Sequence, residues 1–157
     1  MKNTIPDPRF DLVLERVIDV PAKVLWEAWT NPEHVKQWFA PAPWTIVECE
    51  IDLRPGGMFR FVMRSPEGQD YPSIGCYLEA VPHERLVWTD ALLPGYRPSE
   101  NPFFTAVLTM EARGDKTHYK VVAVHRDAEA KQRHEEMGFH EGWGQVLEQL
   151  IAYAKAL

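Results

Sequence analysis

The sequence predicts an α+β fold in which a curved antiparallel sheet wraps around a long C-terminal helix. Two patterns support this prediction: an amphipathic helical stripe over residues 138–157, and six strand-like runs with mostly short links over residues 44–126. Successive strands with short links pair antiparallel. One face of these runs is richer in apolar side chains than the other, so that face and the helical stripe can bury each other.

Composition fits one domain over residues 1–157. The 157-residue chain is 45% hydrophobic and 25% charged, which is enough for a substantial core. The formal net charge of -6 disfavours nucleic-acid and anionic membrane partners, because phosphate binding needs clustered Lys and Arg. The first ten residues are polar and contain neither a signal peptide nor a spanning segment, so a cytoplasmic location is expected. Cys49 and Cys76 lie in apolar strand-like runs, as reduced structural thiols do.

The chain opens with a β-α-α unit. Residues 10–20 alternate apolar and polar side chains with period two, which is typical of a half-buried strand. Pro21 ends this strand and suits the first turn of a helix over residues 22–29. A Thr-Asn-Pro sequence at residues 30–32 breaks that helix, and a second short helix is expected over residues 33–38.

Six strands should follow, separated by turn-forming Gly and Pro residues. They are expected over residues 44–51, 58–64, 73–81, 85–92, 103–113 and 116–126. The one long link, residues 93–102, holds three prolines and one glycine and is expected to be a surface loop or lid.

The final helix carries an unusual pair of glycines. Apolar residues of this segment recur at spacings of three and four and share one helical face. Gly142 and Gly144 flank Trp143 in its first turns, although glycine costs about 1 kcal/mol relative to Ala inside a helix. We expect the two glycines to leave room between helix and sheet, which predicts a cavity.

The expected cavity wall consists of large apolar residues at inward positions of the strands and the helix. They are Phe59, Phe61, Trp88, Phe104, Leu108, Tyr119, Trp143, Leu147 and Leu150. Asp90 and His125 are polar residues with the same inward parity and would orient the polar end of a ligand. A buried carboxyl beside Trp88 would have a raised pKa and could act as an acid or base. The alternative, that water or backbone groups satisfy Asp90 near a strand end, is the favoured one.

No motif indicates a metal, a cofactor or a catalytic nucleophile. His134 and His140 are six residues apart with a glycine between them, whereas the zinc motif needs four, so a solvated helix and its break explain this segment. A Gly-x-Ser-x-Gly motif is absent from the sequence, and neither cysteine has an evident activating partner.

Six motifs spread over nearly the whole chain carry a resemblance to a known family. They are VPAKVLWEAWT at residues 20–30, WFAP at 38–41, DLRPGG at 52–57, GCYLE at 75–79, ERLVWT at 84–89 and EMGFHEGW at 136–143. On these motifs the sequence resembles the START/polyketide-cyclase-like (SRPBCC) superfamily, in the branch named after activators of heat shock protein 90 ATPase. The resemblance implies a helix-grip (START-like, Bet v-like) fold of β-α-α-β6-α order, whose elongated cavity often accepts apolar or amphipathic small molecules.

The resemblance does not choose a function, because one fold supports many. The leading hypothesis is a protein that binds a small apolar or amphipathic ligand and needs no cofactor. One alternative is a cyclase/dehydratase-like enzyme that uses Asp90 or His125. Another is a co-chaperone-type interaction module, although the chain is expected to lack the extra N-terminal domain of the eukaryotic activators. Five aromatic residues near the two short helices are expected to lie mostly in the core and the cavity wall: Trp26, Trp29, Trp38, Phe39 and Trp44. If they were exposed instead, they would serve as a docking patch for a homodimer or a co-chaperone contact.

Overall fold

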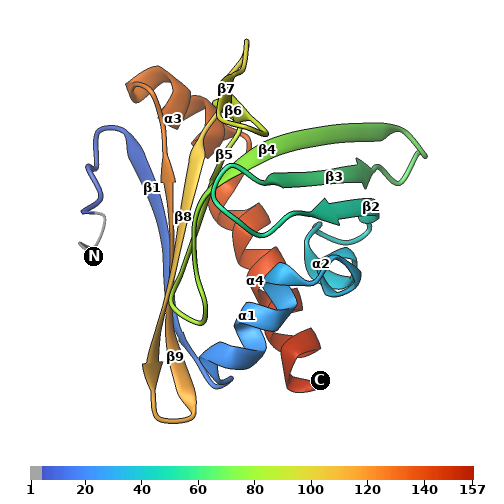
Figure 1. Ribbon diagram of the computed structural model, residues 1–157, viewed down its shortest axis with the longest axis vertical. Coiled ribbons are helices and arrows are strands. Elements are labelled where there is room, and N and C mark those ends of the chain that lie inside the picture. Colours follow the sequence, from blue (N-terminus) through green and yellow to red (C-terminus); the bar gives the residue numbers. More distant parts are fainter. Residues whose placement is uncertain (1–4) are drawn as a thin grey trace.

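The computed structural model describes residues 5–157 and contains a seven-stranded antiparallel sheet in the order β1-β9-β8-β5-β4-β3-β2. The strands are β1 (Asp11–Ile18), β2 (Thr45–Ile51), β3 (Met58–Arg64), β4 (Asp70–Val81), β5 (Arg85–Thr89), β8 (Thr105–Arg113) and β9 (Lys116–Val124). The sheet curls so strongly that β2, β3 and β4 point away from the long β1, β9 and β8 (Figure 1). Part of the polar N-terminal segment, residues 1–4, lies outside the described residues.

Four helices complete the fold: α1 (Ala22–Thr30), α2 (Pro32–Trp38), α3 (Ala128–Glu136) and α4 (Phe139–Lys155). The side chain of Asn31 accepts a hydrogen bond from the Glu33 amide and caps α2, as the Asp127 side chain does for the Ala130 amide in α3. Gly138, at φ 90°, turns the chain between α3 and α4. Within the described residues, no helix is long and apolar enough to cross a membrane.

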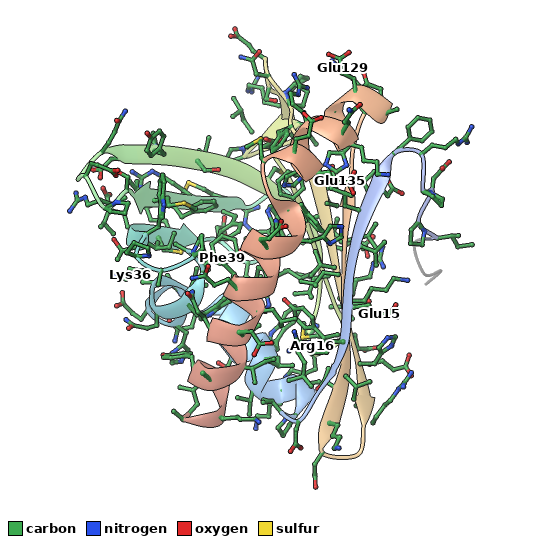
Figure 2. All side chains as sticks on the ribbon, turned by 180° about the vertical axis from the view of Figure 1, so that it is seen from behind. Glu15, Arg16, Lys36, Phe39, Glu129 and Glu135 are labelled. Carbon is green, nitrogen blue, oxygen red and sulfur yellow. The ribbon has the colours of Figure 1, made fainter. Side chains whose placement is uncertain are left out.

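Helix α4 lies across the inner face of the curled sheet (Figure 2). Its buried stripe, made of Val146, Leu147, Leu150 and Ala154, joins inward residues of the strands in one core. Burying a large apolar side chain contributes roughly 1.5–3 kcal/mol, several times the helix-propensity differences of tenths of a kcal/mol among the Ala, Leu, Gln and Glu residues of α4. The order and packing confirm the predicted helix-grip fold.

The tryptophans of α1 and α2 belong to this core and not to the surface. Trp26, Trp29 and Trp38 are at most 5% exposed. The Trp29 indole N–H donates to the Tyr119 hydroxyl at 3.2 Å, and the Trp38 indole N–H donates to the Ala28 carbonyl at 3.1 Å. Their burial confirms the expected core location and disfavours the alternative of a docking patch built on these three residues.

Three segments differ from the elements expected from the sequence. The predicted strand 85–92 ends at Thr89, and the link after it forms a small hairpin of β6 (Leu92–Leu93) and β7 (Arg97–Pro98). Helix α3 adds an element between β9 and α4, and its polar composition explains why periodicity did not reveal it. Strand β4 also begins three residues earlier than expected, at Asp70.

Candidate functional site

A pocket of about 470 Å³ lies between strands β3–β5 and the N-terminal half of α4. The α2–β2 loop and the end of α3 close its sides, and Phe39 from that loop lies beside α4 (Figure 2). Aromatic and aliphatic side chains dominate its wall. The lining residues are Phe39, Pro41, Trp44, Phe59, Phe61, Met63, Ser73, Gly75, Trp88, Asp90, Phe104, His134, Met137, Gly138, Phe139, Gly142, Trp143 and Val146.

The two helix glycines have different surroundings. Gly142 lines the pocket, and a Cβ atom built on it would meet nothing within 4 Å. Gly144 also has open space around a Cβ atom but does not line the pocket. Only Gly142 therefore lies where a larger side chain would take up pocket volume.

Asp90 lies directly after β5 and is held by the start of the β8 segment. Its Oδ1 atom accepts backbone N–H groups from Phe103 at 2.8 Å and from Phe104 at 3.2 Å. Burial raises the pKa of the Asp90 carboxyl, and these hydrogen bonds oppose that effect only in part. Since Oδ1 is occupied, Oδ2 is the oxygen left to meet a molecule in the pocket.

His134 is the second polar group of the pocket and belongs to a histidine pair. Its Nδ1 atom lies 2.8 Å from Nε2 of His125, and Nδ1 of His125 lies 2.8 Å from the Phe10 carbonyl oxygen. The His134 ring is 6% exposed and packs against the rings of Phe103 and Phe104. Burial and the neighbouring His125 lower the pKa of His134 to about 4, so this ring is neutral at pH 7.

The structure brings together six of the residues expected to contact a ligand. Phe59, Phe61, Trp88, Asp90, Phe104 and Trp143 all line the pocket. Leu108, Tyr119, Leu147 and Leu150 lie in the packed core, where α1 fills the space between helix and sheet. His125 does not line the pocket and reaches it only through His134.

Sequence reasoning missed His134. The segment was expected to be a solvated helix, whereas His134 is buried and faces the pocket. One signal in the sequence could have indicated the burial of His134. Its partner His125 is an inward-facing polar residue at the end of a strand, and the segment that becomes α3 follows within a few residues. Phe39 and Trp44 contribute to the pocket wall, as expected for the aromatic residues of this region.

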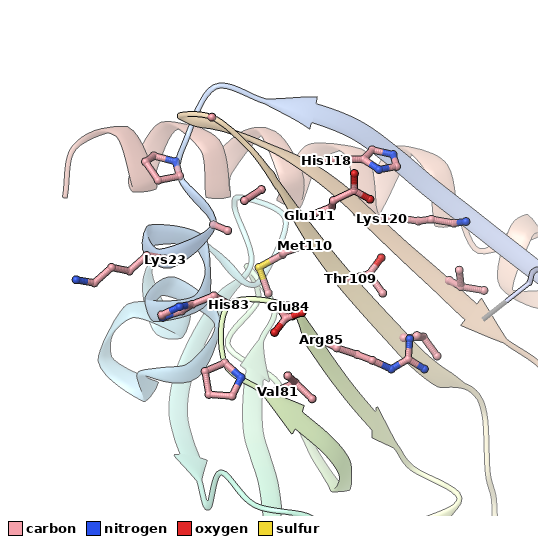
Figure 3. Close-up of a pocket in the computed structure, with 17 residues that line it drawn as sticks. Lys23, Val81, His83, Glu84, Arg85, Thr109, Met110, Glu111, His118 and Lys120 are labelled. Carbon is pink, nitrogen blue, oxygen red and sulfur yellow. The ribbon is translucent and has the colours of Figure 1, made fainter. Parts of the chain in front are cut away.

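A second concavity, of about 990 Å³, has a different character. It is lined mainly by outward residues of β8 and β9, by the β4–β5 hairpin and by the start of α1 (Figure 3). Several of its lining residues are charged or polar and have partners outside the lining: Arg85 forms a salt bridge with Glu79, Glu111 forms one with Arg113, and the His118 ring is hydrogen-bonded to Glu15. This surface is therefore less suited to an apolar molecule than the pocket beside α4.

The described residues offer little for metal or thiol chemistry. Over residues 5–157, no three His, Cys, Asp or Glu side chains are grouped so that they could hold a metal ion. Cys49 and Cys76 are free thiols. Burial raises the pKa of the Cys49 thiol to about 11, which keeps it protonated at neutral pH and weakly nucleophilic.

Comparisons with known proteins identify one family model and many similar structures. The model described as Activator of Hsp90 ATPase homolog 1-like protein matches residues 19–155. The crystal structure of protein NE0264 from Nitrosomonas europaea is 44% identical with a TM-score of 0.93, covering 96% of this chain and 97% of that chain. A protein from Rhodobacter sphaeroides shares the fold at 20% identity and a TM-score of 0.83, with 97% of each chain covered. An AHSA1-like protein from Aeromonas hydrophila shares the fold at 17% identity and a TM-score of 0.68, covering 93% of this chain and 92% of that chain. Among curated proteins no match is found.

Proposed function

The chain belongs to the Activator of Hsp90 ATPase homolog 1-like family, and we propose that it binds a small apolar or amphipathic molecule in the pocket beside α4. The observation that carries this proposal is the pocket itself. Its volume of about 470 Å³ lies within the range of about 300–1,000 Å³ that is typical of small-molecule sites. Its wall is largely aromatic, and Asp90 and His134 supply the few polar groups that such sites use to orient a ligand.

A pair of glycine variants tests this proposal. Gly142→Leu should fill the pocket, whereas Gly144→Leu changes the same helix outside it, and neither new Cβ atom meets another atom within 4 Å. The probe is N-phenylnaphthylamine, an uncharged apolar fluorophore. We expect it to bind the wild type and Gly144→Leu, and to bind Gly142→Leu at least about tenfold more weakly. Equal binding by all three proteins would contradict the proposed site.

Native mass spectrometry of protein purified from its source provides a second readout. A co-purified apolar compound that Gly142→Leu no longer retains would support the proposal. A single domain, a cytoplasmic location and a homodimer stay predictions, and ligand binding depends on none of them.

A proton-transfer enzyme is the second candidate, because the pocket contains a carboxyl group with a raised pKa and a neutral histidine. In this version Asp90 or His134 would touch the substrate, and His125 would act through His134. Turnover that survives both Asp90→Asn and His134→Phe would exclude it. Against a co-chaperone role, burial of Trp26, Trp29 and Trp38 removes three of the five candidate anchors of a contact surface.

A further inference from the structure

The histidine pair fixes which kind of polar group the pocket accepts. A carbonyl oxygen can only accept a hydrogen bond, so His125 carries its proton on Nδ1 to donate to Phe10. In the neutral ring, Nε2 of His125 is then an acceptor. His134 must therefore donate from Nδ1 to His125, which leaves Nε2 of His134 without a proton.

The surroundings of the His134 ring hold it in the neutral form. His134 lies 4.6 Å from the Phe103 ring, 4.9 Å from the Phe104 ring and 5.0 Å from the Phe139 ring, measured between centroids. Among residues 5–157, no carboxylate forms a hydrogen bond with either histidine. A buried cation without such a partner is costly, and burial accordingly lowers the pKa of His134.

Asp90 adds a second acceptor at the same end of the pocket. Its Oδ1 atom holds the amides of Phe103 and Phe104, the dipeptide whose rings pack against His134. From the described residues, Oδ2 of Asp90 and Nε2 of His134 receive no hydrogen bond from another residue. The polar end of the pocket thus offers two acceptors and no charge that would attract an anion.

From this arrangement we propose that the ligand is an apolar, uncharged molecule with a hydroxyl or amino donor at one end, and not a carboxylate. The donor group reaches Nε2 of His134 or Oδ2 of Asp90 while the apolar body lies against the aromatic wall. This inference rests on the proposed function and specifies the ligand class of the same pocket. A fatty acid or another anionic ligand would place its charge beside the Asp90 carboxyl and against the lone pair of His134.

Three probes with one aromatic body test the inference: naphthol, methoxynaphthalene and naphthoate substituted at the same carbon. We expect the wild type to bind naphthol at least about tenfold more tightly than either of the others, because only naphthol is an uncharged donor. His134→Phe keeps an aromatic ring among Phe103, Phe104 and Phe139 but removes the acceptor. This variant should bind methoxynaphthalene within about threefold of the wild type and should largely lose the preference for naphthol.

The failures of the two proposals are distinguishable. If methoxynaphthalene or naphthoate binds the wild type as tightly as naphthol, the proposed preference for an uncharged hydrogen-bond donor is overturned while ligand binding stands. If no probe binds, the proposed function fails and the proposed donor preference fails with it. An unchanged preference for naphthol in His134→Phe and also in Asp90→Asn would overturn the assignment of these two acceptors.

Imidazole nitrogen NMR of the wild type needs no variant that must fold. We expect Nδ1 of both histidines to be protonated and Nε2 of His134 to be unprotonated, and naphthol should shift that Nε2 resonance. A proton on Nε2 of His134 in the free protein would overturn the inference.

Discussion

His134 shows how a single side chain can combine a structural cost with a role in recognition. Its ring is buried beside His125, and its pKa is lowered to about 4 from an ordinary value near 6.5. The folded protein therefore resists protonation of this residue over a pH range in which the unfolded chain accepts a proton. The same lowered pKa keeps Nε2 free to accept a hydrogen bond near neutral pH.

This histidine predicts a loss of stability in mild acid. Because the folded pKa is below the unfolded one, the native state is most favoured above about pH 6.5, and the advantage is lost as pH falls towards 4. The loss attributable to His134 should be on the order of 2–3 kcal/mol. Urea unfolding of the wild type and His134→Phe between pH 7 and 4 measures it as the difference of the two pH profiles. Parallel profiles would contradict the buried neutral histidine.

Two substitutions of Asp90 distinguish the contribution of its hydrogen bonds to stability from the contribution of its charge. The amide oxygen of Asp90→Asn can still accept from Phe103 and Phe104, whereas Asp90→Ala removes the acceptor. Because burial raises the Asp90 pKa, ionisation costs the folded state stability as pH rises through that pKa. At pH 7, Asp90→Asn should therefore be at least as stable as the wild type, and Asp90→Ala less stable by about 1–2 kcal/mol. Chemical denaturation at pH 7 tests both, and a marked loss in Asp90→Asn would contradict this account.

At the scale of elements, α4 departs from the best helical sequence at two glycines, of which Gly142 lines the pocket. Gly142 and Gly144 lie inside the helix, where Ala is favoured, and a Cβ atom at either position meets no neighbour within 4 Å. Gly138 is different because its φ of 90° lies in the left-handed region.

Alanine substitutions at these three glycines should therefore give opposite results. Gly142→Ala and Gly144→Ala should each increase the free energy of unfolding by about 0.5–1 kcal/mol. Gly138→Ala should decrease it by about 1–2 kcal/mol, because an L-residue is strained in the left-handed region. Urea denaturation of the three variants compares them directly. A gain in stability for Gly138→Ala would show that the α3–α4 turn is not constrained in this way.

Helix α4 also positions the loop that closes one side of the pocket. The Gln149 amide donates to the carbonyls of Trp38 at 3.0 Å and Ala40 at 2.7 Å, and its oxygen accepts the Ala42 amide at 2.9 Å. These bonds satisfy backbone groups at and after the C-terminus of α2, which have no intrahelical partner.

Loss of the Gln149 hydrogen bonds should make the α2–β2 loop less ordered. Gln149→Ala is expected to cost about 1–3 kcal/mol of stability and to weaken binding of N-phenylnaphthylamine, because the loop carries Phe39 and Trp44. The matched control is Gln145→Ala, since Gln145 also bonds to the Ala42 carbonyl but is exposed, so that water can replace its bonds. Equal effects of the two variants on stability and binding would contradict the bridging role.

Element prediction succeeded where periodicity was strong and failed where it was weak. The strands and α4 follow their apolar patterns to within a few residues. Helix α3 presents little apolar surface, and only Ala130 and His134 are buried along it. A buried polar residue leaves no hydrophobic pattern in the sequence. The burial of His134 depends on the packing of α3 against His125, which is a tertiary contact that periodicity does not reveal.

At the scale of the whole molecule, strand parity predicts which face a side chain shares but not how far apart two opposing faces lie. Phe104 and Leu108 point to the same side of β8 and its extension, yet one lines the pocket and the other is buried in the core. The difference comes from α1, whose Trp29 fills the core beside Tyr119, whereas beside Gly142 α4 has no side chain to fill the space. The fold could thus be predicted from the sequence, but the extent of the pocket depends on long-range packing.

The most direct test of the account is a titration of glycine-labelled protein with N-phenylnaphthylamine, followed by amide NMR. The chain has nine glycines; Gly75, Gly138 and Gly142 line the pocket, whereas Gly114 lines the outer concavity and Gly68 lies in a hairpin turn away from both. We predict saturable shifts of the Gly75, Gly138 and Gly142 resonances, with Gly68 and Gly114 unchanged. Shifts centred on Gly114, or no shifts at all, would contradict ligand binding beside α4.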